Sequence, residues 1–228
     1  MNLHDLDPAL LERLTLTALE DAVAAAAVAA AHTRGRCDPM LADRVAVDAM
    51  RDRLNADLLA CATVVAGEGE KDGAPMLHRA ELLGPRSDRE LPGESVAIRF
   101  VVDPLESTNC CARGEPGAIS VIAAAVKGEG DFLPMPDCYC EKLVLGRDLA
   151  RQLRVDRTGS GHAYPDLGNF LDWDARELAA WVALHRGKAI RDVVAVVLDR
   201  PRNQGPVQAL RQCDVQVAMI RDGDVTAA

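Results

Sequence analysis

Helical patterns dominate the first quarter of the chain. Asp7-Pro8 pairs a capping acid with a proline suited to the first helical turn, and Gly35 supplies a stop signal. We therefore predict a helix over residues 8–33. Asp38-Pro39 repeats the start signal ahead of a second predicted helix over residues 39–59. The apolar stripe of this second helix consists of Leu41, Val45, Val47, Met50 and Leu54.

Short apolar runs separated by polar turns predict strands along the rest of the chain. Asp174 and Glu177 predict the start of one later helix, which Gly187 ends, and another short helix is expected to reach Cys213. Strands that alternate with helices predict α/β architecture. The expected strands are 62–66, 96–102, 118–126, 193–198 and 215–220, with a strand-like segment at 142–145. Of these, 62–66, 96–102 and 193–198 are expected to be buried. Three glycines and Pro165 in residues 155–168 predict a boundary between domains 1–155 and 156–228.

The segment that follows residues 96–102 carries the strongest candidate chemistry. Proline cannot continue a central strand, so we expect the strand to end at Asp103-Pro104. Asp103 and Glu106 then lie at the carboxyl end of a strand, with Thr108 just beyond. Two carboxylates this close repel each other unless a cation lies between them, and Mg²⁺ and Mn²⁺ prefer oxygen ligands. An acidic turn in water remains the alternative.

A second acidic loop has the same layout. The predicted strand over residues 62–66 leads into Gly67, Glu68, Gly69 and Glu70. Glycine permits unusual backbone angles and the close approach of a ligand. A charged loop at a strand end is usually only solvated, so the repeated layout is what makes this loop a candidate.

Composition narrows the class of protein. Hydrophobic residues make up 49% of the 228 positions but aromatic residues only 3%, which predicts an aliphatic core rich in alanine and valine. The net charge of −9 argues against nucleic-acid and anionic-membrane partners. The apolar run at residues 22–31 is too short to span a bilayer, and residues 1–7 lack the basic start of a signal peptide. Seven irregularly spaced cysteines fit no disulfide framework, so we expect a cytoplasmic protein.

Six strings, in this order, make the chain similar to the class II fructose-1,6-bisphosphatases of the lithium-sensitive sugar-phosphatase superfamily. They are Ala42-Asp43, VVAGEGEKDGAPML at 64–77, VDPLEST at 102–108, PDCYCEKLVLG at 136–146, LDRPR at 198–202 and IRDGDV at 220–225. The resemblance covers residues 42–228. It implies a layered α-β-α-β-α fold whose second αβα domain is incomplete in this sequence.

The resemblance also implies a set of roles. The implied metal ligands, for Mn²⁺ or Mg²⁺, are Asp43, Glu68, Asp103 and Glu106. Asp103, Glu106 and Thr108 are the implied catalytic residues, with Thr108 helping to orient the attacking water. The implied substrate contacts are Thr108, Tyr139, Arg200, Arg202, Asp222 and Asp224.

Plainer alternatives exist for several of these residues. Asp43 can instead stabilise the N-terminus of its helix, and Tyr139 can be an ordinary core or rim residue. Arg200 and Arg202 can form a solvated turn rather than fork onto a second phosphate. Asp222 and Asp224 lie so near residue 228 that they can be frayed.

The chain departs from the family pattern at several positions. Pro39 and Met40 replace a usual Lys-Asn pair, which removes a cation facing the phosphates. Ser107 replaces a glycine, and a positive φ there would cost serine about 1 kcal/mol or more. Family members continue beyond the Asp-Gly-Asp motif to a further metal-binding glutamate, so we expect an open sheet edge here. The added cysteines are expected to be small apolar replacements rather than a soft-metal site; they are Cys110, Cys111, Cys138 and Cys140.

These observations predict a cytoplasmic phosphoric monoester hydrolase of sugar-phosphate metabolism and gluconeogenesis. It would hydrolyse the 1-phosphate of fructose 1,6-bisphosphate to fructose 6-phosphate, with a small sugar phosphate as its partner and a homo-oligomeric assembly. One alternative is another substrate, such as sedoheptulose 1,7-bisphosphate or an inositol-type monophosphate. The other is a catalytically impaired sugar-phosphate binder or assembly subunit, which Pro39 and Ser107 favour.

Overall fold

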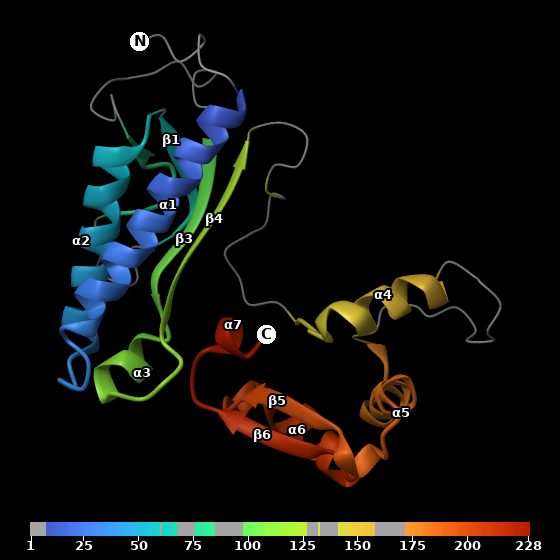
Figure 1. The fold of residues 1–228 in the computed structure, drawn as a ribbon. Coiled ribbons are helices and arrows are strands. Elements are labelled where there is room, and N and C mark those ends of the chain that lie inside the picture. Colours follow the sequence, from blue (N-terminus) through green and yellow to red (C-terminus); the bar gives the residue numbers. More distant parts are fainter. Residues whose placement is uncertain are drawn as a thin grey trace. The chain divides into compact units, whose positions relative to one another are not determined.

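A computed structural model describes most of the chain as two compact units, Met1–Asp137 and Cys138–Ala228 (Figure 1). The residues that it describes are 8–59, 61–67, 76–84, 98–126, 132, 141–157 and 172–228. The division between the units comes earlier in the chain than the domain boundary expected at residue 155.

Two long helices open the first unit, as the sequence predicts. The helix α1 spans Pro8–Ala31 and α2 spans Pro39–Asp57. Asp38 caps α2, because its Oδ1 accepts a hydrogen bond of 2.9 Å from the Leu41 amide. The predicted stripe of α2 is partly right: Leu41 and Val45 are only half-buried, and alanines take their place in the core. The buried residues of α2 are Ala42, Ala46, Val47, Met50 and Leu54.

The two helices pack on a mixed four-stranded sheet (Figure 1). Its strands are β1 (Ala62–Ala66), β2 (Leu82–Leu83), β3 (Ile98–Glu106) and β4 (Ile119–Val126), in the order β2-β1-β3-β4. β1 runs parallel to β3, whereas β2 and β4 are antiparallel to their neighbours. The short helix α3, Thr108–Arg113, follows β3 directly.

Small side chains let α1 join the core closely. Ala18, Ala22, Ala26 and Ala30 recur every fourth residue, and each is at most 3% exposed. By length and composition alone, the segment Glu12–Ala31 is apolar enough to cross a membrane. The shorter run at residues 22–31, considered from the sequence, is too short to do so. In the fold, however, the alanine face of this segment belongs to the same core cluster as α2 and the sheet. The alanine-rich core expected from composition is thus confirmed.

The second unit combines helices with a two-stranded parallel sheet. It contains α4 (Gly146–Arg157), α5 (Ala175–Arg186), η5 (Ile190–Asp192), β5 (Val194–Leu198), η6 (Pro201–Asn203), α6 (Gln204–Gln212), β6 (Gln216–Ile220) and α7 (Asp224–Ala227). β5 and β6 pair in register from Val194–Gln216 to Leu198–Ile220. The capping box of α5 is confirmed, since Asp174 and Glu177 bond each other's backbone amides.

Two predictions in this unit are wrong. Residues 142–145 do not form a strand; they run irregularly into α4, which begins at Gly146. Residues 193–198 are not buried, because Val194 and Val196 on β5 are 57% and 48% exposed. An apolar run indicates a strand but does not reveal whether anything covers it. Both units nevertheless mix helices with strands, which confirms the α/β class.

Candidate functional site

A bulge in β3 shapes the acidic end of the first unit. Asp103 pairs with Val121 of β4 and Glu106 pairs with Ile119, so Pro104 and Leu105 together oppose one residue, Ser120. The prediction that the strand ends at Asp103-Pro104 is therefore wrong. A bulge tolerates the missing amide of proline, and β3 continues to Glu106. The Ser120 hydroxyl donates a hydrogen bond of 2.7 Å to the Pro104 carbonyl.

The bulge brings two carboxylates to one face of the sheet. In a regular strand, residues three apart point to opposite faces. Residues paired across strands share a face, and Val121 and Ile119 lie two apart on β4, so Asp103 and Glu106 share a face as well. The burial of side chains along β3 agrees with this shared face, since Pro104 and Leu105 are both buried whereas Asp103 and Glu106 are half-buried. The extra residue therefore places both carboxylates on the same face of the sheet.

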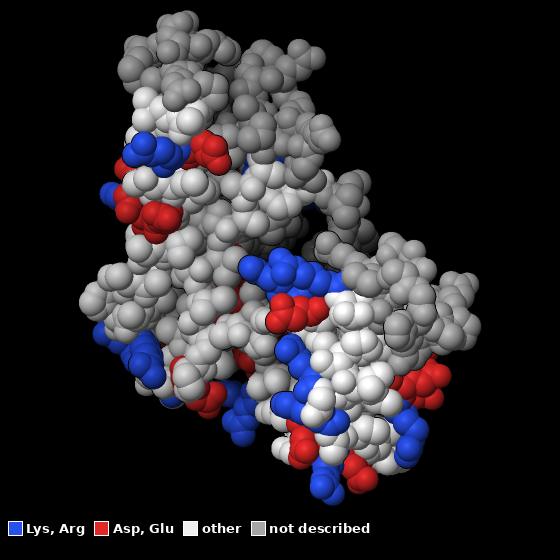
Figure 2. Space-filling model, turned by 45° about the vertical axis from the view of Figure 1, so that its right-hand side comes forward, with Lys and Arg blue, Asp and Glu red and all other residues white. Residues whose placement is uncertain are grey.

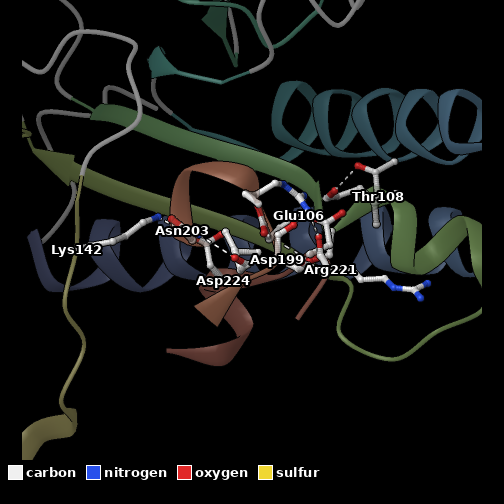
Figure 3. A network of polar contacts seen from close by, with 12 residues as sticks. Glu106, Thr108, Lys142, Asp199, Asn203, Arg221 and Asp224 are labelled. Carbon is white, nitrogen blue, oxygen red and sulfur yellow. Dashed lines mark hydrogen bonds and ion pairs between the residues drawn. The ribbon is translucent and has the colours of Figure 1, made fainter. Parts of the chain in front are cut away.

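Hydrogen bonds hold the turn after these carboxylates. The Leu105 amide donates to Asp103 Oδ1 at 3.1 Å. The Thr108 hydroxyl donates to the Leu105 carbonyl at 2.8 Å (Figure 3). The Ser107 hydroxyl lies 3.5 Å from Glu106 Oε1. The hydroxyl hydrogen of Thr108 is thus committed to the backbone, which leaves its oxygen as an acceptor.

Ser107 adopts a backbone conformation that favours glycine. Its φ is 67° and its ψ 46°, in the left-handed region, and the residue is 5% exposed. The positive φ considered from the sequence is confirmed, and an L-residue there costs roughly 1–2 kcal/mol. This buried turn is therefore strained at the residue that links Glu106 to Thr108.

Asp43 lies further along its helix than the sequence suggested. The first turn of α2 contains no acidic residue, which places Asp43 in the second turn. The attraction between a carboxylate and a helix N-terminus falls off within the first turn, so the dipole alternative loses its support. α2 packs on both β3 and α3, the elements that carry Asp103 and Thr108.

Two predicted site residues, Glu68 and Tyr139, lie outside the described residues, as do Cys138 and Cys140. Within the described ranges, no group of three or more His, Cys, Asp or Glu side chains is placed to hold a metal ion. The candidate ligands for a metal ion are the carboxylates of Asp103 and Glu106, which lie on one face of the sheet. Carboxylate oxygens are the donors that hard divalent cations prefer.

Gly67, at the end of β1, faces the protein itself rather than a ligand. A Cβ atom at this position would lie 2.2 Å from the Leu77 carbonyl oxygen and 2.9 Å from Val102 Cγ2. The need for glycine predicted here is thus explained by close packing of the chain.

The cysteines of α3 are part of the packed interior. Cys110 and Cys111 are 7% and 5% exposed, and the Cys111 thiol donates to the Ala30 carbonyl at 3.5 Å. Their burial supports the interpretation of these two as small apolar replacements.

In the second unit, Arg200 and Asp222 follow neighbouring strands. β5 and β6 are parallel, so their carboxyl ends, Leu198 and Ile220, meet at one edge of the sheet. Arg200 Nη1 donates to the Arg221 carbonyl at 2.6 Å and to the Asp199 carbonyl at 3.1 Å. Its Nη2 lies 3.9 Å from Asp222 Oδ1. Arg200 thus ties the two strand ends together, while Arg202 is exposed on η6.

The Asp222-Gly223-Asp224 turn receives a second cation that sequence reasoning missed. Lys142 Nζ lies 2.5 Å from Asp224 Oδ2 (Figure 3). The two residues are 82 positions apart, so no spacing rule connects them. Gly223 is buried and has a φ of 86°, a conformation suited to glycine. Both acids are half-buried and belong to an ordered turn rather than a frayed end.

Mixed charge is general on the surface that Figure 2 shows. Among the described residues, basic and acidic side chains lie next to one another in small groups on this face. Among the ion pairs of the first unit, Arg53 pairs with Asp57 at 2.8 Å and with Asp21 at 3.3 Å.

Comparisons with known proteins agree with these motifs. The family model "Bacterial fructose-1,6-bisphosphatase, glpX-encoded" matches residues 13–228. Relatives named D-fructose 1,6-bisphosphatase class 2/sedoheptulose 1,7-bisphosphatase are 36% identical over 214 residues in both Synechococcus elongatus and Thermosynechococcus vestitus. The relative from Synechocystis is 35% identical over 213 residues. Each match covers 91% of this chain but 56% of the relative, so the chain spans about half the length of the curated relatives it matches. The chain belongs to the family of bacterial fructose-1,6-bisphosphatases.

Proposed function

We propose that the protein is a phosphatase that hydrolyses the 1-phosphate of fructose 1,6-bisphosphate to fructose 6-phosphate and phosphate. The observation that carries this proposal is the bulge in β3, which presents Asp103 and Glu106 on one face immediately before Thr108. Membership of a fructose-1,6-bisphosphatase family supports the choice of substrate.

The proposed ligands of a divalent cation, Mn²⁺ or Mg²⁺, are Asp43, Glu68, Asp103 and Glu106. Such an ion, when bound, neutralises phosphate charge and acidifies a water molecule. The strained backbone at Ser107 and the hydrogen bond from Leu105 to Asp103 preset the two strand carboxylates for this task.

Thr108 is proposed to orient the attacking water. Its hydroxyl hydrogen is donated to the Leu105 carbonyl, so its oxygen accepts a hydrogen bond from the water. This bond directs a lone pair of the water toward phosphorus, in line with the leaving oxygen.

The second unit is proposed to contact the sugar and the phosphate that is not cleaved. Arg202, exposed beside Pro201, suits the phosphate, since guanidinium groups bind phosphate oxygens in pairs. Arg200 is proposed to contact the same phosphate. Tyr139 is proposed to contact the sugar. Asp222 and Asp224 accept hydrogen bonds from sugar hydroxyls.

Sedoheptulose 1,7-bisphosphate is a second candidate substrate, because the names of the relatives couple both activities. Family membership also supports our proposal of the layered α-β-α-β-α fold, a homo-oligomeric assembly and a cytoplasmic place in gluconeogenesis.

The test is phosphate release from each bisphosphate by the purified chain, with and without Mn²⁺. We expect metal-dependent release by the wild type and none by Asp103→Ala. The matched control is Asp52→Ala, which removes an exposed acid from α2 and should leave the rate unchanged. Equal rates for Asp103→Ala and the wild type would refute the assignment, and a folded wild type that releases no phosphate would refute the activity.

A further inference from the structure

Asp222 and Asp224 are two acids of one turn after β6, separated in the sequence by Gly223 alone. Like charges at this spacing repel each other and repel an anionic substrate. Gly223 between them is buried and has a positive φ of 86°. Other groups must therefore compensate the charge.

Two cations from distant parts of the second unit meet this turn. Arg200, from the end of β5, approaches Asp222 and bonds the Arg221 carbonyl. Lys142, from the segment ahead of α4, pairs with Asp224 at 2.5 Å. The lysine side chain is 60% exposed and the Asp224 side chain 32%. Exposed ion pairs contribute little to folding stability, so orientation of the carboxylate is the more important consequence.

We propose that Lys142 is a positioning residue that holds the Asp224 carboxylate in place to bind a sugar hydroxyl. The ammonium engages Oδ2, and a carboxylate has enough lone pairs to accept a further hydrogen bond. The positive charge also removes the repulsion between Asp224 and a phosphorylated substrate. This inference rests on the proposed function, in which Asp224 contacts the sugar.

Lys142 connects two recognition segments. It follows Tyr139 by three residues in the sequence, and the ion pair joins its segment to the turn after β6. Loss of Lys142 should therefore weaken the binding of the sugar phosphate while the hydrolytic step, assigned to Asp103, Glu106 and Thr108, continues.

The experiment measures KM, kcat and the Kd of fructose 6-phosphate for the wild type, Lys142→Met, Lys142→Arg and Asp224→Asn. We expect Lys142→Met to raise KM and Kd about tenfold, as loss of a hydrogen bond to a charged group does, with kcat nearly unchanged. Lys142→Arg should restore most of the affinity. Lys188→Met is the matched control, because it removes an exposed lysine after α5 and should change nothing.

A double variant separates positioning from a general effect of charge. If Lys142 acts through Asp224, adding Lys142→Met to Asp224→Asn should raise Kd no further. Additive losses, or a Lys142→Met variant with wild-type KM and Kd, would overturn the inference.

The two readouts also separate the failure of the inference from that of the proposed function. A wild type that binds fructose 6-phosphate but releases no phosphate would refute the proposed phosphatase activity. The positioning role of Lys142 would then be tested by the Kd values of the variants. A wild type that neither binds fructose 6-phosphate nor releases phosphate would overturn both the inference and the proposed function.

Discussion

The two clusters of predicted site residues are built by different physical means. In the first unit, β3 lies between two strands, and the residues around its acids are buried: Pro104, Leu105 and Ser107. In the second unit, the sheet has two strands with exposed valines on β5. There, Arg200 and Lys142 hold the turn by ion pairs and hydrogen bonds.

The two ways of placing the carboxylates determine which substitutions each cluster can tolerate. Where strand register and buried packing place the carboxylates, a change in the backbone is costly because its neighbours cannot relax. Where exposed polar contacts place them, a change alters orientation while leaving the fold almost intact. We therefore expect changes in the first unit to affect chemistry and stability, and changes in the second to affect substrate affinity.

The largest expected effect contrasts Glu106→Gln with Asp222→Asn. Glu106→Gln removes a proposed metal ligand and should lower kcat about 10²- to 10³-fold, the equivalent of several kcal/mol of transition-state stabilisation. Asp222→Asn should instead raise KM and leave kcat within about threefold. Steady-state kinetics with saturating Mn²⁺ measure both, and a reversed pattern would contradict the proposed division of roles between the two units.

The next largest effect concerns two glycines. Gly67→Ala should destabilise the first unit by about 1–3 kcal/mol, because the new methyl group overlaps the Leu77 carbonyl. Gly205→Ala in α6 is the matched control, since its Cβ meets nothing within 4 Å. It should be neutral or stabilise the helix by up to about 1 kcal/mol. Urea unfolding followed by circular dichroism measures both, and equal stability of the two variants would contradict the packing around Gly67.

The units should also differ in stability. Both tryptophans, Trp173 and Trp181, lie in the second unit, where their ring centroids are 6.4 Å apart. Their fluorescence therefore reports on that unit, whereas far-ultraviolet dichroism is weighted toward the long helices α1 and α2. We expect the fluorescence midpoint about 1 M urea below the dichroism midpoint, a gap of about 1–3 kcal/mol at typical m-values. Coincident transitions would instead indicate a single cooperative fold.

The smallest effect tests the strained turn. Ser107→Gly should raise stability by up to about 1 kcal/mol, because glycine accepts a positive φ that serine resists, although its flexible unfolded state offsets part of the gain. Ser107→Ala retains the strain and should give no gain. Thermal unfolding compares the two variants, and a stabilised alanine variant would assign the effect to the hydroxyl group rather than to the backbone.

Local sequence signals predicted elements well, since their physics is local. Asp38 and Pro39 predicted the start of α2, and the pattern of residues 62–66 predicted β1 with its observed bounds. The bulge at Pro104 was missed, because pairing with β4 rather than the proline alone decides where β3 ends.

Long-range contacts lay beyond sequence reasoning. Lys142 belongs to a recognised motif, but its approach to Asp224 depends on how the second unit folds. The exposure of Val194 and Val196 likewise depends on what covers β5, which an apolar run does not reveal.

We propose that the bulge in β3 creates a divalent-metal site, and calorimetric titration of the purified chain with Mn²⁺ is the test of that claim. We expect the wild type to bind Mn²⁺ and Asp103→Asn to weaken binding at least about tenfold, the equivalent of about 1.4 kcal/mol. Asp222→Asn, the counterpart at the strand end of the second unit, should bind like the wild type. Undiminished binding by Asp103→Asn would contradict the claim.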